Sequence, residues 1–223
     1  MLYFHSWSGG KDSTASIILD HIHGLPHSKI IFSEVMFDKK KGISGEMPEH
    51  IEWVKKKAKP LFQEWGYEVE ILHSEYDYLT LFNRPIEKSK VPERNGKIRA
   101  FPLGGMCYAN RDMKSKAVNK FFANYRGQDY IQYVGIAIDE PKRLESLHKR
   151  KGQVSLLEQF NYTEEMAYQL CKEYDLLSPI YQNSKRGAAG FARTPQSRKW
   201  HTQSHITRKC GRNWLDFHRH PIW

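Results

Sequence analysis

The sequence feature that most constrains this chain is the segment Ser8 to Thr14, in which a glycine pair precedes a lysine, an aspartate and two hydroxyl residues. An apolar run, Leu2 to Trp7, comes before this glycine loop, and a helix-like run, Ala15 to Ile22, follows it. This order predicts a strand, a tight turn and the start of a helix. Adjacent glycines adopt positive φ at little cost and let a ligand come close to the backbone.

The start of the predicted helix has the properties of an anion site. The first N–H groups of a helix have no partner inside it, and the helix dipole is positive there. Ser8, Ser13 and Thr14 add hydroxyl donors, and Lys11 adds a charge. We therefore predict that the loop binds phosphate or sulfate, with a plain capped turn as the alternative. The spacing matches neither Gly-x-x-x-x-Gly-Lys-Ser/Thr nor Gly-x-Gly-x-x-Gly.

Length and cysteine content limit the class of protein. A chain of 223 residues is long enough for an α/β domain with its own core. No segment approaches the roughly 20 apolar residues that span a bilayer, and we expect no signal peptide and no membrane partner. Cys107, Cys171 and Cys210 lie far apart, so we expect no disulfide framework and a cytoplasmic setting. The sequence indicates no oligomeric state.

The net charge of +10 suggests a nucleic-acid partner, but its distribution weakens that interpretation. Residues 187–223 hold seven Lys/Arg and one acid, whereas the other 186 residues carry 28 basic and 24 acidic side chains. The basic excess is therefore mostly a property of this tail.

Strand-like and helix-like patterns alternate along the chain, which predicts an α/β fold with parallel strands and right-handed crossovers. Ligands of such sheets bind beyond the carboxyl ends of the strands. We therefore expect the loops after Trp7 and Ile138 to share one cleft. Residues 37–47 are predicted to be a loop. The predicted elements are strands at 2–7, 29–36, 68–72 and 129–138 and helices at 15–22, 48–65, 112–125 and 164–174.

The stretch from Asn83 to Gly105 differs from its surroundings. It contains three prolines, three glycines and six basic residues with no clear period. A loop of this length is usually functional or disordered. We predict a lid over an anionic substrate, with a solvated loop as the alternative.

Several segments together resemble the phosphoadenosine phosphosulfate (PAPS) reductase-like branch of the PP-loop superfamily, especially its uncharacterised phage- or plasmid-borne members. The superfamily includes the ATP pyrophosphatases and the adenine nucleotide α-hydrolase-like proteins. The resemblance extends from residue 1 to about residue 186 and implies one doubly wound, Rossmann-like α/β domain. The segments that carry it are 8–14, 33–38, 43–50, 91–96, Cys107 with 110–112 and Lys114, 133–141 and 176–181.

The resemblance also implies a ligand and a set of site residues. The ligand is an adenine nucleotide, ATP or PAPS, or an adenylyl sulfate, with or without Mg²⁺, attacked at the α-phosphate or at sulfur. Gly135 would let the nucleotide approach the backbone. For Lys114 and Arg143 the alternative is a solvated helix face, and for Asp139 a helix cap. The implied catalytic residues are Lys11, Asp12 and Arg111, and the implied nucleotide-binding residues are Ser8, Gly9, Gly10, Ser13, Thr14, Lys114, Gly135, Asp139 and Arg143.

The cysteines depart from the family pattern. Relatives continue Arg-Gly-Gly-Cys-Trp-Phe-Cys-Pro-Asn where residues 186–194 read Arg-Gly-Ala-Ala-Gly-Phe-Ala-Arg-Thr. Cys107 would belong to an iron–sulfur or zinc site only beside a restored Cys-x-x-Cys; alone it is a small buried hydrophobe, as we expect of Cys171. Reductase activity is therefore doubtful. The alternative function is nucleic-acid modification of the thiolation type, or nucleic-acid binding through the basic tail.

We predict that residues 188–223 are translated in a shifted reading frame. Deleting one G from GGC-GGC-TGC-TGG, which encodes Gly-Gly-Cys-Trp, and borrowing the first T of the next codon gives GGC-GCT-GCT-GGT, which encodes the Gly-Ala-Ala-Gly of residues 187–190. The same shift converts Phe-Cys-Pro-Asn-Ala into the Phe-Ala-Arg-Thr-Pro of residues 191–195. Such a tail should pack poorly. A genuine, divergent basic tail is the alternative.

Overall fold

The computed structural model describes residues 1–26, 28–99 and 109–183. Cys107, Cys210 and the tail predicted to be frameshifted lie outside the described residues, as does the end of the predicted lid. No helix in the described ranges is long and apolar enough to cross a bilayer.

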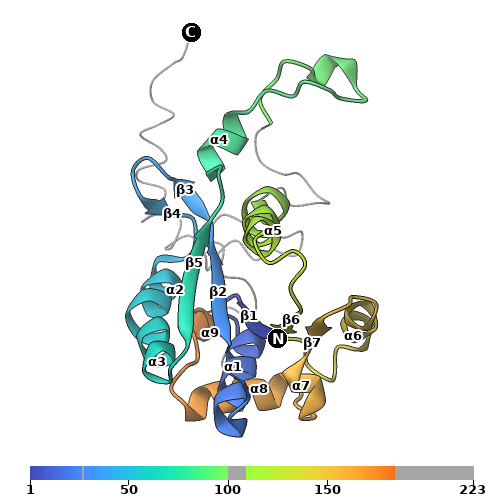
Figure 1. Cartoon of the computed structure of the whole chain (residues 1–223). Helices are drawn as coiled ribbons and strands as arrows, with labels where there is room; N and C mark the ends of the chain where they lie inside the picture. The colour runs from blue at the N-terminus through green and yellow to red at the C-terminus, as the bar shows by residue number, and fades with distance from the viewer. Residues whose placement is uncertain (27, 100–108, 184–223) are drawn as a thin grey trace.

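The described residues form an α/β fold around one five-stranded parallel sheet (Figure 1). The strand order is β5-β2-β1-β6-β7, and every neighbouring pair is parallel. The central strand β1 pairs with β2 on one side and with β6 on the other. This order confirms the doubly wound sheet. The strands are β1 (Leu2–Trp7), β2 (Lys29–Glu34), β5 (Glu68–His73), β6 (Tyr130–Val134) and β7 (Gln153–Val154).

One face of the sheet carries the main hydrophobic core. Trp7 of β1 and Phe32 of β2 point to this face, where they meet Ile17 and Phe62 from the covering helices. The removal of such apolar side chains from water stabilises the fold. The helices on this face are α1 (Lys11–His23), α2 (Pro48–Trp53), η1 (Val54–Ala58), α3 (Lys59–Glu64), α7 (Leu156–Gln159) and α8 (Glu164–Glu173).

The opposite face is covered by helices from later in the chain. Successive side chains of a strand point to opposite faces of the sheet, so Phe4 and Ile31 point away from the main core. They pack against Phe121. Leu144 and Leu147 form a smaller cluster beside β6. The helices here are η3 (Ala109–Ser115), α5 (Lys116–Ala123) and α6 (Pro141–His148); α4 (Tyr78–Asn83), η2 (Pro92–Arg94) and α9 (Ile180–Asn183) connect the layers or extend from them.

The helix predicted over residues 48–65 is present but not uniform. Its middle, Val54–Ala58, is a π-helix, and Pro60 follows it. Proline has no N–H to donate and its ring clashes with the preceding turn. A wider turn before Pro60 accommodates both, and the helix continues to Glu64.

Two predicted boundaries were wrong. The strand predicted to reach residue 36 ends at Glu34, and residues 37–47 are not a plain loop, since β3 (Met36–Asp38) pairs antiparallel with β4 (Ile43–Ser44). Gly42, at φ +66°, lets the chain reverse between them. The strand predicted to reach Ile138 ends at Val134, because the Ile138 N–H donates to the Tyr162 carbonyl instead of extending the ladder.

Candidate functional site

The glycine loop lies where the strand order reverses. From β1 the chain crosses through α1 to β2, whereas β6 pairs on the other side of β1. The loops after β1 and β6 are adjacent, since a Cβ on Gly135 would lie 2.4 Å from the Ser13 nitrogen. They therefore share one end of the sheet, as predicted, at the position where doubly wound sheets bind ligands.

The loop folds back on itself through its serines. Gly9 has φ +71°, which a residue with a side chain rarely adopts. The Ser8 N–H donates to the Ser13 hydroxyl at 3.2 Å, and that hydroxyl donates to the Gly10 carbonyl at 3.0 Å. Within the described part of the chain, no hydrogen-bond acceptor is paired with the N–H of Gly9 or Asp12. The loop therefore retains unpaired donors at the start of α1.

The Thr14 hydroxyl is used inside the protein, where it ties the start of α1 to β1. Its Oγ1 accepts a hydrogen bond from Trp7 Nε1 at 3.0 Å, and the residue is fully buried. A ligand contact through Thr14 stays a prediction.

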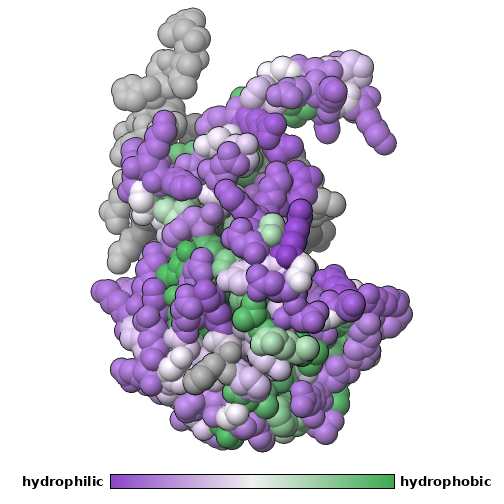
Figure 2. Space-filling model, in the orientation of Figure 1, coloured by the Kyte–Doolittle hydropathy of each residue, from purple (hydrophilic) through white to green (hydrophobic). Residues whose placement is uncertain are grey.

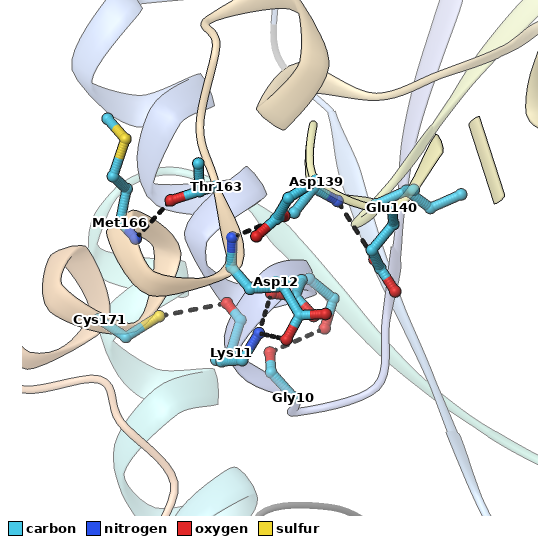
Figure 3. Close-up of polar contacts among 12 residues, drawn as sticks. Gly10, Lys11, Asp12, Asp139, Glu140, Thr163, Met166 and Cys171 are labelled. Carbon is cyan, nitrogen blue, oxygen red and sulfur yellow. Dashed lines mark hydrogen bonds and ion pairs between the residues drawn. The ribbon is translucent and has the colours of Figure 1, made fainter. Parts of the chain in front are cut away.

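Lys11 is already paired with two carboxylates (Figure 3). Its Nζ lies 2.6 Å from Asp12 Oδ1 and 2.9 Å from Glu164 Oε2, with 14% of the side chain exposed. Burial lowers the pKa of Lys11, but its hydrogen bonds to both carboxylates outweigh burial and raise it. The pKa of Asp12 is also raised, chiefly by burial, although Lys11 opposes this.

The loop after β6 adds two more carboxylates to this group. Asp139 Oδ1 accepts a hydrogen bond from the Glu164 N–H at 3.0 Å and so helps to cap the start of α8 (Figure 3). Glu140 binds the Arg143 guanidinium at 2.5 Å and also raises the pKa of Asp12. The predicted residues Asp139 and Arg143 are thus close to the loop through Glu164 and Glu140, and both have protein partners.

Two side chains that carried no predicted role contact the loop directly. The Tyr181 hydroxyl accepts a hydrogen bond from the Lys11 N–H at 2.9 Å. The His50 ring is fully buried against Gly9, where a Cβ would lie 2.4 Å from His50 Cε1. Its Nδ1 lies 2.8 Å from the Ser178 hydroxyl, and burial lowers its pKa. Both residues belong to segments of the family resemblance, but no local pattern indicates that they meet residues 8–14.

Lys114 and Arg111, both on η3, have different surroundings. Lys114 Nζ lies 2.9 Å from the buried carboxylate of Glu46, and both side chains shift the pKa of His50. Lys114 is therefore electrostatically coupled to the loop. Arg111 instead binds Asp112 at 2.6 Å in a separate hollow, and none of its contacts in the described ranges reaches residues 8–14. A catalytic role for Arg111 stays a prediction.

The metal predictions find no support in the described ranges. No group of three or more His, Cys, Asp or Glu side chains there forms a metal site, and Cys107 lies outside them. Cys171 is buried in the core, as predicted, and its thiol donates to the Lys11 carbonyl at 3.2 Å. Burial raises the pKa of this thiol to about 12, so it is an unreactive thiol.

No protein-family profile matches the chain, and no curated protein matches it. The structure defines the chain at the level of architecture, as an α/β protein with a doubly wound, five-stranded parallel sheet.

Proposed function

We propose that this chain is a PAPS reductase-like PP-loop protein that binds an adenine nucleotide or an adenylyl sulfate through the glycine loop. One observation carries the proposal: the loop places the start of the 13-residue helix α1 at the point where the strand order reverses. Helix N-termini bind phosphate, and switch points of doubly wound sheets bind nucleotides. The positive φ of Gly9 gives the backbone the shape that this requires.

The pairing of Lys11 bears on how an anion would bind. Its ammonium contacts Asp12 and Glu164, and Glu140 is near, so the surroundings of Lys11 are rich in carboxylate. A bare phosphate meets repulsion there unless Lys11 changes partner or a cation accompanies the ligand. We therefore propose that the nucleotide binds better with Mg²⁺ than without it.

The proposed chemistry is nucleophilic attack at the α-phosphate or at sulfur. The N–H groups at the start of α1 would stabilise the negative charge that develops on the attacked group. Lys11 would hold the leaving anionic oxygens, released from Asp12 or Glu164 as the ligand enters.

A thermal-unfolding screen tests the proposal. The ligands are ATP, AMP, adenylyl sulfate and its 3′-phosphate, each with and without Mg²⁺. A ligand at 100 times its dissociation constant should add about 2.7 kcal/mol to the free energy of unfolding. The absence of any shift, in protein that unfolds cooperatively, would reject the proposal.

Two lysine variants test whether the ligand-dependent stabilisation arises at the glycine loop. Lys11→Gln should remove most of the ligand-dependent shift. Lys29→Gln is the matched control, because Lys29 also contacts two carboxylates, Glu68 at 2.8 Å and Glu70 at 3.7 Å, but at the opposite end of the sheet. If both variants lose the shift equally, the ligand responds to overall charge and not to the loop.

A further inference from the structure

The positive charge of the described residues is concentrated in one segment. Residues 84–99 and 109–120, here together called the basic segment, contain ten Lys/Arg and three Asp/Glu, a net charge of +7. The other described residues contain 16 Lys/Arg and 21 Asp/Glu, a net charge of −5. The uneven charge therefore does not depend on the tail. The ten basic residues are Arg84, Lys88, Lys90, Arg94, Lys97, Arg99, Arg111, Lys114, Lys116 and Lys120.

The first part of the basic segment, residues 84–99, is an arm with its own backbone structure. The Arg99 N–H donates to the Arg84 carbonyl, and the Ile86 N–H donates to the Lys97 carbonyl, each at 2.9 Å. Pro85 and Ile98 form an antiparallel bridge between the two sides. In Figure 1 the arm extends beyond α4, away from the sheet, and Figure 2 shows a largely hydrophilic surface over it. Its backbone pairing thus holds a shape that buries little apolar area.

The base of the arm holds three cations around one carboxylate. Asp112, whose side chain is 5% exposed, contacts Arg111 at 2.6 Å, Lys116 at 3.2 Å and Arg99 at 3.5 Å. The hollow at this point is lined by five basic side chains and by two acids, Asp112 and Glu87, so the bases outnumber the acids there. Arg84 and Lys88 line the same open hollow, whose volume is about 240 Å³. The buried Asp112 carboxylate holds Arg99, Arg111 and Lys116 in position.

We propose that the arm and the start of α5 bind the sugar-phosphate backbone of a nucleic acid. A single small anion would occupy the hollow alone, whereas the arm carries further exposed cations beyond it in sequence, among them Lys90 and Arg94. A chain of phosphates can contact several separate cations, and arginine and lysine are the side chains that contact phosphates. The net negative charge of the remaining described residues repels the same polyanion and confines it to this side.

The η3 helix connects the base of the arm to side chains that pack on the glycine loop. Lys114, three residues from Arg111, contacts Glu46, and both act on His50, which packs against Gly9. The proposal nevertheless stands without nucleotide binding, because the charges and the hollow do not involve the loop.

Fluorescence anisotropy with the full chain tests the proposal. The probes are a labelled single strand and a labelled duplex of about 20 nucleotides per strand, without added nucleotide, at salt concentrations from roughly 50 to 200 mM. The variant Lys88→Gln/Lys90→Gln/Arg94→Gln removes three exposed charges from the arm. The control Lys142→Gln/Lys149→Gln/Lys151→Gln removes three exposed charges on and just after α6.

We expect the arm variant to weaken binding at least tenfold at low salt and to reduce the salt slope by about 2 to 3, since each lost phosphate contact removes about 0.7 to 0.9. The control should change affinity less than the arm variant does. Equal effects of the two variants would overturn the proposal. The proposal would also be overturned if the chain bound labelled poly-glutamate but not nucleic acid and the arm variant weakened that binding. The partner would then be an acidic protein.

Discussion

The glycine loop and the arm are both candidate anion sites, but they are built in opposite ways. The loop is packed: Gly9 rests on a buried histidine, and Lys11 is held by two carboxylates. The arm is exposed, and the space around Gly96, at φ +79°, is empty to 4 Å. The loop therefore depends on backbone N–H groups whose position requires tight packing. The arm depends on side-chain charge, which requires almost none.

This contrast predicts that added methyl groups are costly in one region and tolerated in the other. Gly135→Ala should give the largest loss, about 3 kcal/mol of unfolding free energy, because its Cβ would lie 2.4 to 2.6 Å from backbone atoms of Asp12 and Ser13. Gly96→Ala is the control and should cost about 1 kcal/mol, from its positive φ alone. Urea denaturation measures both. Similar costs would mean that the loop is not packed more tightly than the arm.

A double-mutant cycle tests the packing of Gly9 on His50. Gly9→Ala should cost about 2 to 3 kcal/mol, because it strains a positive φ and its Cβ would meet the His50 ring at 2.4 Å. In a His50→Ala background the clash is gone, so the same change should cost about 1 kcal/mol. Independent, additive costs would show that the ring does not support the loop.

At the base of the arm we expect a smaller contribution to the free energy of unfolding, and this contribution depends on pH. Arg111, helped by Lys116, lowers the pKa of Asp112 to about 2 from its ordinary 3.8. A lowered pKa stabilises the fold above the ordinary value, and this stability is lost as the pH falls from about 4 to about 2. Because the partners are half exposed, we expect about 1 to 2 kcal/mol at low salt.

Asp112→Asn isolates this contribution. The difference in unfolding free energy between the wild type and the variant should be present at pH 6 and shrink towards zero near pH 2. Added salt should reduce it. A difference that stays constant across this range would mean that Asp112 does not act through its charge.

The parts of the fold that were predicted correctly are those with strong local patterns. The observed strands Leu2–Trp7 and Glu68–His73 lie within one residue of their predicted bounds. The start of a helix directly after the glycine pair was predicted from the loop sequence itself. The antiparallel pair β3–β4 was missed, because strands of two and three residues show no period. The π-helix was missed because a helical pattern does not show where Pro60 widens the turn.

The site was predictable in its centre but not in its surroundings. Residues 8–14 are contiguous, so their roles follow from order along the chain. Glu164, Tyr181 and His50 reach the loop from distant helices. No periodicity reports contacts between positions that are 41 to 170 residues apart. Arg111 is the opposite case, because its place in the sequence did not indicate that it binds its neighbour Asp112.

Amide hydrogen exchange tests the central claim most directly, because it reports where a nucleotide is bound. Exchange is followed by mass spectrometry on peptides that cover residues 8–14 and residues 84–99, with and without ATP and Mg²⁺. We predict that nucleotide slows exchange in residues 8–14 by about tenfold or more and leaves the arm unchanged, since bound phosphate occupies the N–H groups at the start of α1. Nucleotide that stabilises the protein but protects the arm, and not the glycine loop, would contradict the account.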